Sequence, residues 1–307
     1  MTINAHPEIP SFEYIRPATL MDASRFLSQH AGEARPLLGG TDIFVRMRDG
    51  AWRDQYLVDI KQLPGADELS FDPNAGLTIG AAVNMNRVIA SGDVQQFYPL
   101  LAEACRSVAS YQLRSRATIV GNICNASPAG DTIGACMALD GVLTVHGEGG
   151  TRQVPLENFF VGPGKTILRP GEIVISLHFP PPVPGSAGAY IKLGRNNWSD
   201  LSIVGVTALC KPDTATASGY RFRIGLASVA PIPLVAATAQ DYLANTPLTA
   251  GSFKEAARLA QEACSPIDDV RGSARYRKAM VYQLTLNALQ KTWKRLQDAK
   301  NIVGTVR

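Results

Sequence analysis

The sequence predicts an α+β protein with at least two domains. Amphipathic stretches with the 3.6-residue spacing of helices alternate with short apolar runs that are typical of strands. The stretch PPPVPGSAG at 180–188 divides these segments into two sets and is the best candidate for a linker. The chain has 307 residues, of which 46% are hydrophobic, so it can fill two cores or three small ones.

The first part of the chain is expected to alternate between short helices and strands. Residues 19–31 carry apolar side chains at helical spacing, and Thr19 or Asp22 can cap the start of this helix. The next predicted elements are a strand at 34–40, a short helix at 42–50 and a strand at 54–65. Gly50 ends the second helix, and the pair Pro64–Gly65 closes the last strand.

From about residue 66 the chain is expected to form a second set of strands and helices. The predicted elements are a strand, a turn and the start of a helix at 77–91, a helix at 98–110, a hairpin with the turn GEGG at 141–160, and a strand at 172–182. Residues 118–132, TIVGNICNASPAGDT, are too polar and irregular for a helix or a strand, so we expect a loop there.

Beyond the linker, the sequence predicts a sheet followed by helices. Strands are predicted at 188–210 and 220–233, and helices at 252–265 and 274–299. The last helix is long and amphipathic, with a polar face rich in Lys, Arg and Gln. We therefore expect it to pack on the sheet.

Composition and charge exclude several classes of function. The net charge is only +4 and no dense cluster of Lys and Arg is present, so the sequence does not indicate a nucleic-acid partner. No apolar run approaches the roughly 18–20 residues that span a bilayer, and no secretory signal is visible. The five cysteines have no C-x-x-C spacing and fit reduced, buried thiols. We expect a soluble cytoplasmic protein with no metal site of its own.

The stretch PLLGGTDI at 36–43 places two glycines where a strand should pass into a helix. Glycine has no side chain and reaches positive φ without cost, so Gly39 and Gly40 could let a ligand approach the backbone. Backbone N–H groups and the start of the next helix would suit a phosphate or pyrophosphate, and Thr41 could donate its hydroxyl. The alternative is a tight turn without a ligand, because GGTD is neither the dinucleotide fingerprint nor a P-loop.

A second stretch, TIVGNICNASPAGD at 118–131, also indicates a ligand. Gly121 beside Asn122 could approach a pyrophosphate closely, and small polar side chains such as Ser127 offer further hydrogen bonds. Asp131 could accept hydrogen bonds from ribose or ribityl hydroxyls. The alternative is a polar Ω-loop with no ligand.

Motifs along nearly the whole chain resemble the FAD-binding medium subunit of molybdenum hydroxylases. That family includes the carbon monoxide dehydrogenase medium chain and the flavin domain of xanthine dehydrogenase. The two stretches above are similar to its FAD-binding loops. The other motifs are SFEYIRPATLMDA at 11–23, FFVGPGKTILRPGEIVISLHFP at 159–180, YIKLGRNNWSDLSIVGVTA at 190–208, RIGLASVAPIPLVA at 223–236 and DDVRGSARYRKAMV at 268–281.

The resemblance implies a fold, a function and partners. The fold would be an FAD-binding fold of the vanillyl-alcohol oxidase (PCMH) type, with subdomains at 1–62 and 63–182. A C-terminal domain of the CO dehydrogenase flavoprotein type would follow at 183–307. The chain would bind FAD non-covalently and pass electrons from the [2Fe–2S] clusters of a small subunit to NAD, a quinone or oxygen. A large molybdopterin subunit would hydroxylate the substrate, in a dimer of heterotrimers.

The resemblance also implies which residues contact FAD, with no catalytic residue among them. The segment from Leu38 to Ile43 would wrap the pyrophosphate and flavin side, the segment 118–122 would oppose it, and Asp131 would hold sugar or ribityl hydroxyls. Ile173 or Val174 would touch the adenine end, Lys192 would lie near the isoalloxazine ring, and Leu201 would cover one flavin face. The full predicted set is Leu37, Leu38, Gly39, Gly40, Thr41, Asp42, Ile43, Ala109, Thr118, Val120, Gly121, Asn122, Ser127, Asp131, Ile173, Val174, Lys192 and Leu201.

Three positions depart from the pattern of the family. Leu38 stands where many members have alanine, and Val120 stands where many have glycine, which narrows the backbone conformations at one predicted phosphate contact. Leu201 is aliphatic where some relatives carry an aromatic residue, so we expect weaker stacking on the flavin. The cysteines lack the grouping of the extra [4Fe–4S] loop in 4-hydroxybenzoyl-CoA reductases, so that branch is not expected.

Two other functions are left open at this stage. A stand-alone FAD oxidase of the vanillyl-alcohol oxidase type would need a base over the flavin and often a covalent flavin link, and no such constellation is visible. A protein that kept the fold and lost the flavin is favoured only by Val120. The lack of an acid–base pair fits a subunit whose cofactor carries the redox step.

Overall fold

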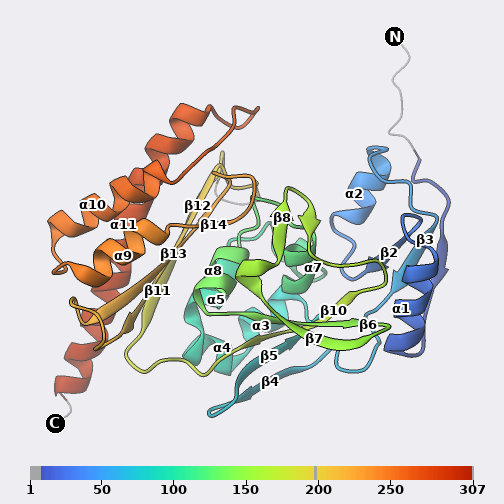
Figure 1. Ribbon diagram of the computed structural model, residues 1–307, viewed down its shortest axis with the longest axis horizontal. Helices are drawn as coiled ribbons and strands as arrows, with labels where there is room; N and C mark the ends of the chain where they lie inside the picture. The colour runs from blue at the N-terminus through green and yellow to red at the C-terminus, as the bar shows by residue number, and fades with distance from the viewer. Residues whose placement is uncertain (1–7, 197–198, 306–307) are drawn as a thin grey trace.

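The structure, a computed structural model, describes residues 8–196 and 199–305. It confirms the α+β class, because three units of sheet and helix follow one another along the chain, coloured blue, green and orange in Figure 1. Parts of the predicted first subdomain (1–7), of the motif at 190–208 (197–198) and of the C-terminal domain (306–307) lie outside the described residues.

A parallel sheet of three strands forms the first unit. Its strands are β1 (Glu13–Ile15), β2 (Ala34–Leu37) and β3 (Tyr56–Asp59), in the order β1-β3-β2, and its helices are α1 (Leu20–Gln29) and α2 (Ile43–Arg48). The predicted strands and helices of this region are confirmed. Thr19 is the N-cap of α1, since its hydroxyl accepts a hydrogen bond from the Asp22 N–H at 3.1 Å. The GGTD turn therefore does connect a strand to a helix.

An antiparallel sheet of five strands forms the second unit. Its strands are β4 (Leu69–Asp72), β5 (Gly76–Gly80), β10 (Ile173–Phe179), β6 (Val142–Gly147) and β7 (Gly150–Pro155), in that spatial order. The predicted hairpin is confirmed, with Gly147 paired to Gly150 at its turn. The remaining elements are α3 (Met85–Ala90), α4 (Gly92–Phe97), α5 (Pro99–Arg106), α6 (Tyr111–Arg114), α7 (Ile119–Cys124), α8 (Ile133–Ala138), the 3₁₀ helix η1 (Leu156–Asn158), β8 (Phe160–Gly162) and β9 (Lys165–Thr166).

The prediction that residues 118–132 form an irregular loop is wrong, because α7 occupies the first half of this stretch. Thr118 is its N-cap, and the Thr118 hydroxyl accepts a hydrogen bond from the Gly121 N–H at 2.9 Å. The buried face of the helix consists of Ile119, Val120 and Ile123. The spacing of these three residues is helical. It was not recognised in the sequence, because the glycine and asparagine on the other face make the stretch look polar and irregular. The short helices α4, α6 and α8 were not predicted either.

The third unit is an antiparallel sheet with helices on both faces. The strands are β11 (Ala187–Leu193), β12 (Val204–Pro212), β13 (Tyr220–Ala227) and β14 (Leu234–Val235), and the helices are α9 (Ala237–Asn245), α10 (Ala250–Glu262) and α11 (Ala274–Thr305). The predicted packing of the last helix is confirmed, since α11 lies on β11 and β12 (Figure 1). Helix α9 was missed by the sequence analysis. The other face of the sheet packs on α5 and α8. Because helices cover both faces, β12 is buried from Val204 to Cys210.

The second and third units pack closely through α8 and β13. A methyl group at Gly225 in β13 would lie only 3.1 Å from the Cα of Gly134 in α8, so small residues permit this approach. We propose that the three units correspond to the two FAD-binding subdomains and the C-terminal domain, with boundaries near 62 and 182. No helix in the described ranges has the length and apolar character needed to cross a membrane.

Candidate functional site

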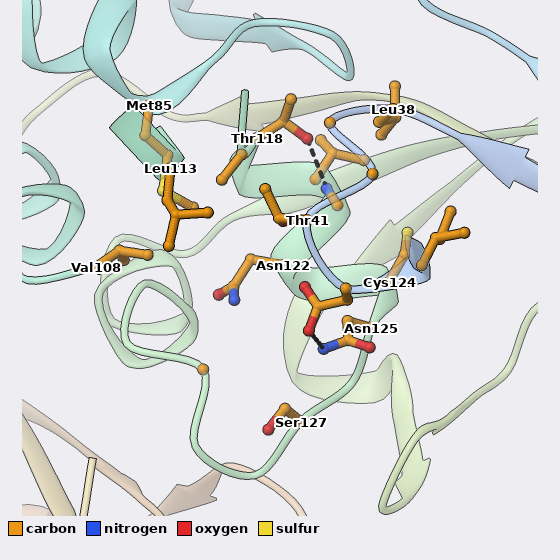
Figure 2. A pocket seen from close by; sticks show the side chains of 18 of the residues that line it. Leu38, Thr41, Met85, Val108, Leu113, Thr118, Asn122, Cys124, Asn125 and Ser127 are labelled. Atoms are coloured by element: carbon orange, nitrogen blue, oxygen red, sulfur yellow. Dashed lines mark hydrogen bonds between the residues drawn. The ribbon is translucent and has the colours of Figure 1, made fainter. Parts of the chain in front are cut away.

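A cavity of about 550 Å³ lies between the turn that follows β2 and the segment that contains α7. Both segments line it: Thr41 belongs to the first, and Asn122 and Asn125 belong to the second (Figure 2). The wall includes every predicted cofactor contact except Leu37 and Lys192. The structure thus brings together segments that are far apart in the sequence.

The two glycines of the first segment have different structural roles. A Cβ on Gly39 would lie 2.2 Å from the carbonyl oxygen of Arg116, so the two segments meet backbone to backbone. Gly40 has a φ of +73°, and a Cβ there would lie 2.7 Å from the Phe44 ring. Both positions therefore require glycine in this fold, independently of any ligand.

Side chains also fix the two segments to each other. The Arg116 Nε donates a hydrogen bond to the carbonyl oxygen of Gly39 at 3.1 Å, and the Asn125 Nδ2 donates to Asp42 Oδ1 at 3.1 Å (Figure 2). Burial raises the pKa of Asp42, and the opposing effects of Arg46, Asn125 and Thr41 are smaller. The two segments therefore form one rigid rim of the cavity.

The first segment presents free hydrogen-bond donors to the cavity. Within the described part of the chain, no group accepts a hydrogen bond from the backbone N–H of Gly39, Gly40 or Thr41. The helices α2 and α7 both begin beside this point, so their first N–H groups add partial positive charge. Clustered N–H donors with a positive dipole suit an anionic group such as a phosphate.

The valine at 120, which departs from the family pattern, does not disturb the second segment. Val120 lies in the first turn of α7, where its side chain packs in the core and is only 1% exposed. A Cβ on the next residue, Gly121, would lie 2.9 Å from the Thr118 hydroxyl oxygen that caps the helix. Asn122 is held in turn, because its Oδ1 accepts a hydrogen bond from the Thr132 hydroxyl at 2.8 Å. A valine therefore fits at 120, whereas a side chain at 121 would displace the Thr118 hydroxyl that caps the helix.

Apolar side chains form the walls beside this polar rim. The members of this surface are Leu38, Met85, Val108, Ala109, Leu113 and Leu201. Ala109 has a φ of +41°, which is unusual for a residue other than glycine. The Arg114 Nη1 holds it there by donating hydrogen bonds to the carbonyl oxygens of Val108 at 2.7 Å and Ala109 at 2.9 Å. Apolar lining of this kind suits an aromatic ring system.

A second group of wall residues was not predicted from the sequence. Ile173 and Val174 were predicted, but Glu172, Arg35 and Trp52 also line the cavity. The Arg35 guanidinium lies 3.7 Å from the centre of the Trp52 ring. Hydrogen bonding to Arg152 lowers the pKa of Glu172. No motif marks these residues, so only the tertiary structure could reveal them.

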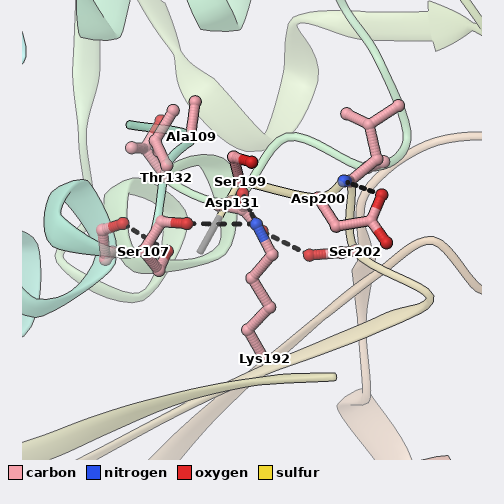
Figure 3. A network of polar contacts seen from close by, with 12 residues as sticks. Ser107, Ala109, Asp131, Thr132, Lys192, Ser199, Asp200 and Ser202 are labelled. Atoms are coloured by element: carbon pink, nitrogen blue, oxygen red, sulfur yellow. Dashed lines mark hydrogen bonds and ion pairs between the residues drawn. The ribbon is translucent and has the colours of Figure 1, made fainter. Parts of the chain in front are cut away.

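The two predicted contacts outside the cavity wall have other partners. Leu37 is buried in a small core with Met47 and Leu57. The Lys192 Nζ donates hydrogen bonds to Asp131 Oδ2 at 2.8 Å and to the carbonyl oxygen of Ser107 at 3.0 Å (Figure 3). Direct contact between Lys192 and a cofactor therefore stays a prediction, and its ion pair with Asp131 is what the structure shows.

These features fit the cofactor that the sequence analysis implied. The free N–H groups of the first segment could bind an anionic group such as a pyrophosphate, and apolar side chains line other parts of the cavity. A carboxylate, that of Asp131, also lines the cavity. Among the described residues, no group of three or more His, Cys, Asp or Glu side chains is arranged to hold a metal ion.

Cys124 lines the cavity, and we predict that it is unreactive in the native protein. Burial raises the pKa of its thiol to about 12. Because the thiolate is the nucleophile, only about one thiol in 10⁴ is ionised near pH 8. Alkylation with iodoacetamide followed by peptide mass spectrometry should label Cys124 only after unfolding in urea. Rapid labelling of the native protein would contradict this account of its surroundings.

Comparison with known proteins matches both parts of the chain to described families. Residues 10–182 match the family described as the FAD binding domain in molybdopterin dehydrogenase. Residues 189–292 match the CO dehydrogenase flavoprotein C-terminal domain. The first match alone covers more than half of the chain.

Individual relatives are similar over almost their full length. The xanthine dehydrogenase FAD-binding subunit of Escherichia coli O157:H7 is 31% identical, over 89% of this chain and 92% of the relative. The carbon monoxide dehydrogenase medium chain of Hydrogenophaga pseudoflava is 32% identical, over 93% and 98%. In a solved structure of carbon monoxide dehydrogenase from the same organism, one chain superposes with a TM-score of 0.89 at 32% identity. That match covers 94% of this chain and 99% of the other.

Proposed function

Since the chain belongs to the family of FAD-binding subunits of molybdopterin dehydrogenases, we propose that it is the medium subunit of a molybdenum hydroxylase. In this role it relays electrons through non-covalently bound FAD to an external acceptor. The observation that carries the proposal is the cavity rim, where free N–H groups of one segment meet the start of α7. When bound, FAD supplies the redox chemistry, and the chain supplies its position and surroundings.

Each wall of the cavity has a proposed role toward FAD. The segments 38–43 and 118–122 would hold the pyrophosphate, with Ser127 nearby. Ile173 and Val174 would contact the adenine end. Leu201 and Ala109 would border the flavin ring, which the apolar wall shields from water. A carboxylate has about four acceptor positions, and three side chains occupy three of those on Asp131, which leaves one for a sugar or ribityl hydroxyl.

Partner subunits would supply the rest of the reaction. We propose a large molybdopterin subunit and a small [2Fe–2S] subunit, assembled as a dimer of heterotrimers in the cytoplasm. The support comes from the relatives, several of which are named as medium chains of dehydrogenases. NAD, a quinone or oxygen would be the acceptor. A stand-alone oxidase is disfavoured, since the relatives described above are subunits.

Purification under native conditions, from the cells that produce the protein, tests the proposed relay. We expect two further polypeptides to co-purify with the chain, together with molybdenum, iron and FAD in fixed ratio. Metal analysis and flavin absorbance on the same gel-filtration peak measure these ratios. A chain that elutes alone and reduces its flavin with an organic substrate would instead establish the oxidase.

A further inference from the structure

A buried carboxylate joins the FAD-binding part of the chain to the C-terminal sheet. Asp131 Oδ1 accepts hydrogen bonds from the hydroxyls of Tyr190, at 2.6 Å, and of Ser202. Asp131 Oδ2 accepts one from Lys192 at 2.8 Å, and Figure 3 shows Lys192 and Ser202 beside Asp131. Asp131 precedes α8, whereas Tyr190 and Lys192 lie on β11 and Ser202 precedes β12. All three donors therefore reach across the same boundary.

The hydroxyl donors in this cluster are isolated from water. Asp131 is 6% exposed, Tyr190 is 5% exposed and Ser202 is fully buried. Burial, reinforced by the neighbouring Asp131 charge, raises the pKa of Tyr190 well above its ordinary value. Tyr190 therefore keeps its proton and stays a donor. Hydrogen bonds to a charged acceptor in such a dry setting are strong and hold their geometry.

A second connection crosses the same boundary at Ser228. Its N–H donates to the carbonyl oxygen of Pro128 at 2.7 Å, and its hydroxyl donates to the carbonyl oxygen of Ser202 at 2.7 Å. Ser228 has a φ of +67°, a costly conformation for serine that persists only where the surroundings enforce it. Arg277, only 3% exposed, donates to the carbonyl oxygens of Ser228 and Ile203 at 3.0 and 2.9 Å.

Leu201 is the cavity-lining residue that stands next to these connections in the chain. It directly precedes Ser202, lines the cavity, and is 56% exposed. Its N–H donates to the Oδ1 of Asp200 at 2.9 Å, which shapes the turn but does not tie it to the FAD-binding part. Its neighbour Ser202 makes that connection, by donating a hydrogen bond to Asp131.

We propose that Asp131, Tyr190, Ser202 and Ser228 form an interdomain clamp that positions Leu201 against the flavin ring. The clamp rests on the proposed function, because it assigns the flavin to this cavity. Through this clamp the C-terminal sheet determines the surroundings of the flavin ring, whereas the segment 38–41 determines the affinity for FAD. The four clamp residues are positioning residues that act through Leu201.

The test uses the variant Y190F/S202A, which removes both hydroxyl donors to Asp131 and leaves the Lys192 ion pair. We expect the dissociation constant for FAD to change by less than about threefold, since the rim is untouched. The visible circular dichroism of the bound flavin, which reports the asymmetry around the ring, should change clearly. Its spectrum should approach that of Leu201→Ala. Lys211→Met is the matched control, because the Lys211–Asp140 ion pair joins the same two parts away from the cavity.

Combining the changes decides whether the clamp acts through Leu201. We expect Leu201→Ala to add little to the spectral change in the Y190F/S202A background, because the contact of Leu201 with the ring would already be lost there. Additive changes, or a wild-type flavin spectrum in a folded Y190F/S202A protein, would overturn the proposal. If that variant fails to fold, Ser228→Gly takes its place, since it removes the hydroxyl and relieves the positive φ. A wild-type protein that binds no FAD would refute the proposed function instead.

Discussion

Replacing Gly39 by alanine is expected to weaken FAD binding by about 100-fold or more, since two misplaced charge-assisted hydrogen bonds account for that loss. The new Cβ would lie 2.2 Å from the Arg116 carbonyl oxygen, so the turn after β2 must move away from α7. The free N–H groups of the turn would then no longer converge with the start of α7. Overpacking of this kind also costs about 1–3 kcal/mol of stability. Titration of the flavin-free protein with FAD, followed by fluorescence, measures the affinity.

Gly92→Ala is the matched control for this prediction. Gly92 begins α4, has no atom within 4 Å of the position a Cβ would take, and does not line the cavity. Alanine there should leave FAD affinity unchanged and stability equal or slightly higher, because alanine favours helices. Equal affinities for Gly39→Ala and Gly92→Ala would show that the convergence of the two segments is not what binds FAD.

Lys192→Met should lower the free energy of unfolding by about 3–5 kcal/mol, the usual cost of leaving one member of a buried ion pair without its partner. Asp131 is 6% exposed, and its positively charged partner, the Lys192 Nζ, lies 2.8 Å from its Oδ2. Methionine keeps most of the volume of the lysine side chain, so the loss of stability would come from the missing charge. Urea unfolding of the flavin-free protein, followed by circular dichroism, gives the free energy directly.

A second pair of residues calibrates the Lys192 result. Lys211→Met removes an ion pair with Asp140, whose side chain is 47% exposed, so we expect a loss below about 1 kcal/mol. Adding Asp131→Asn to Lys192→Met should recover part of the stability, because the unpaired charge is gone. Similar losses for Lys192→Met and Lys211→Met would contradict the account of Asp131 as a buried charge.

The two explanations offered for the paired glycines turn out to be compatible. The tight-turn explanation is supported, because Gly40 has positive φ and Gly39 meets the opposing backbone. The ligand explanation is supported by the N–H groups that the same turn leaves free within the described chain. Local pattern and composition could predict the strand, the turn and the helix here, since all three depend on residues close in sequence.

Other parts of the site could not be predicted from the sequence for a physical reason. Helix α7 was not predicted, because its outer face consists of a glycine and an asparagine and its apolar face has only three residues. The partners of Asp131 lie 59 to 71 positions away, and no local spacing encodes such contacts. The strained conformation of Ser228 likewise depends on Pro128 and Arg277, which come from other segments.

We propose that this cavity holds FAD without a covalent bond. An absorbance spectrum of the purified protein, taken before and after acid precipitation, tests it most directly. We predict that the visible bands of oxidised flavin accompany the native protein and move to the supernatant on precipitation. Flavin that stays in the pellet would show a covalent link. A colourless protein that does not take up added FAD would contradict the claim as a whole.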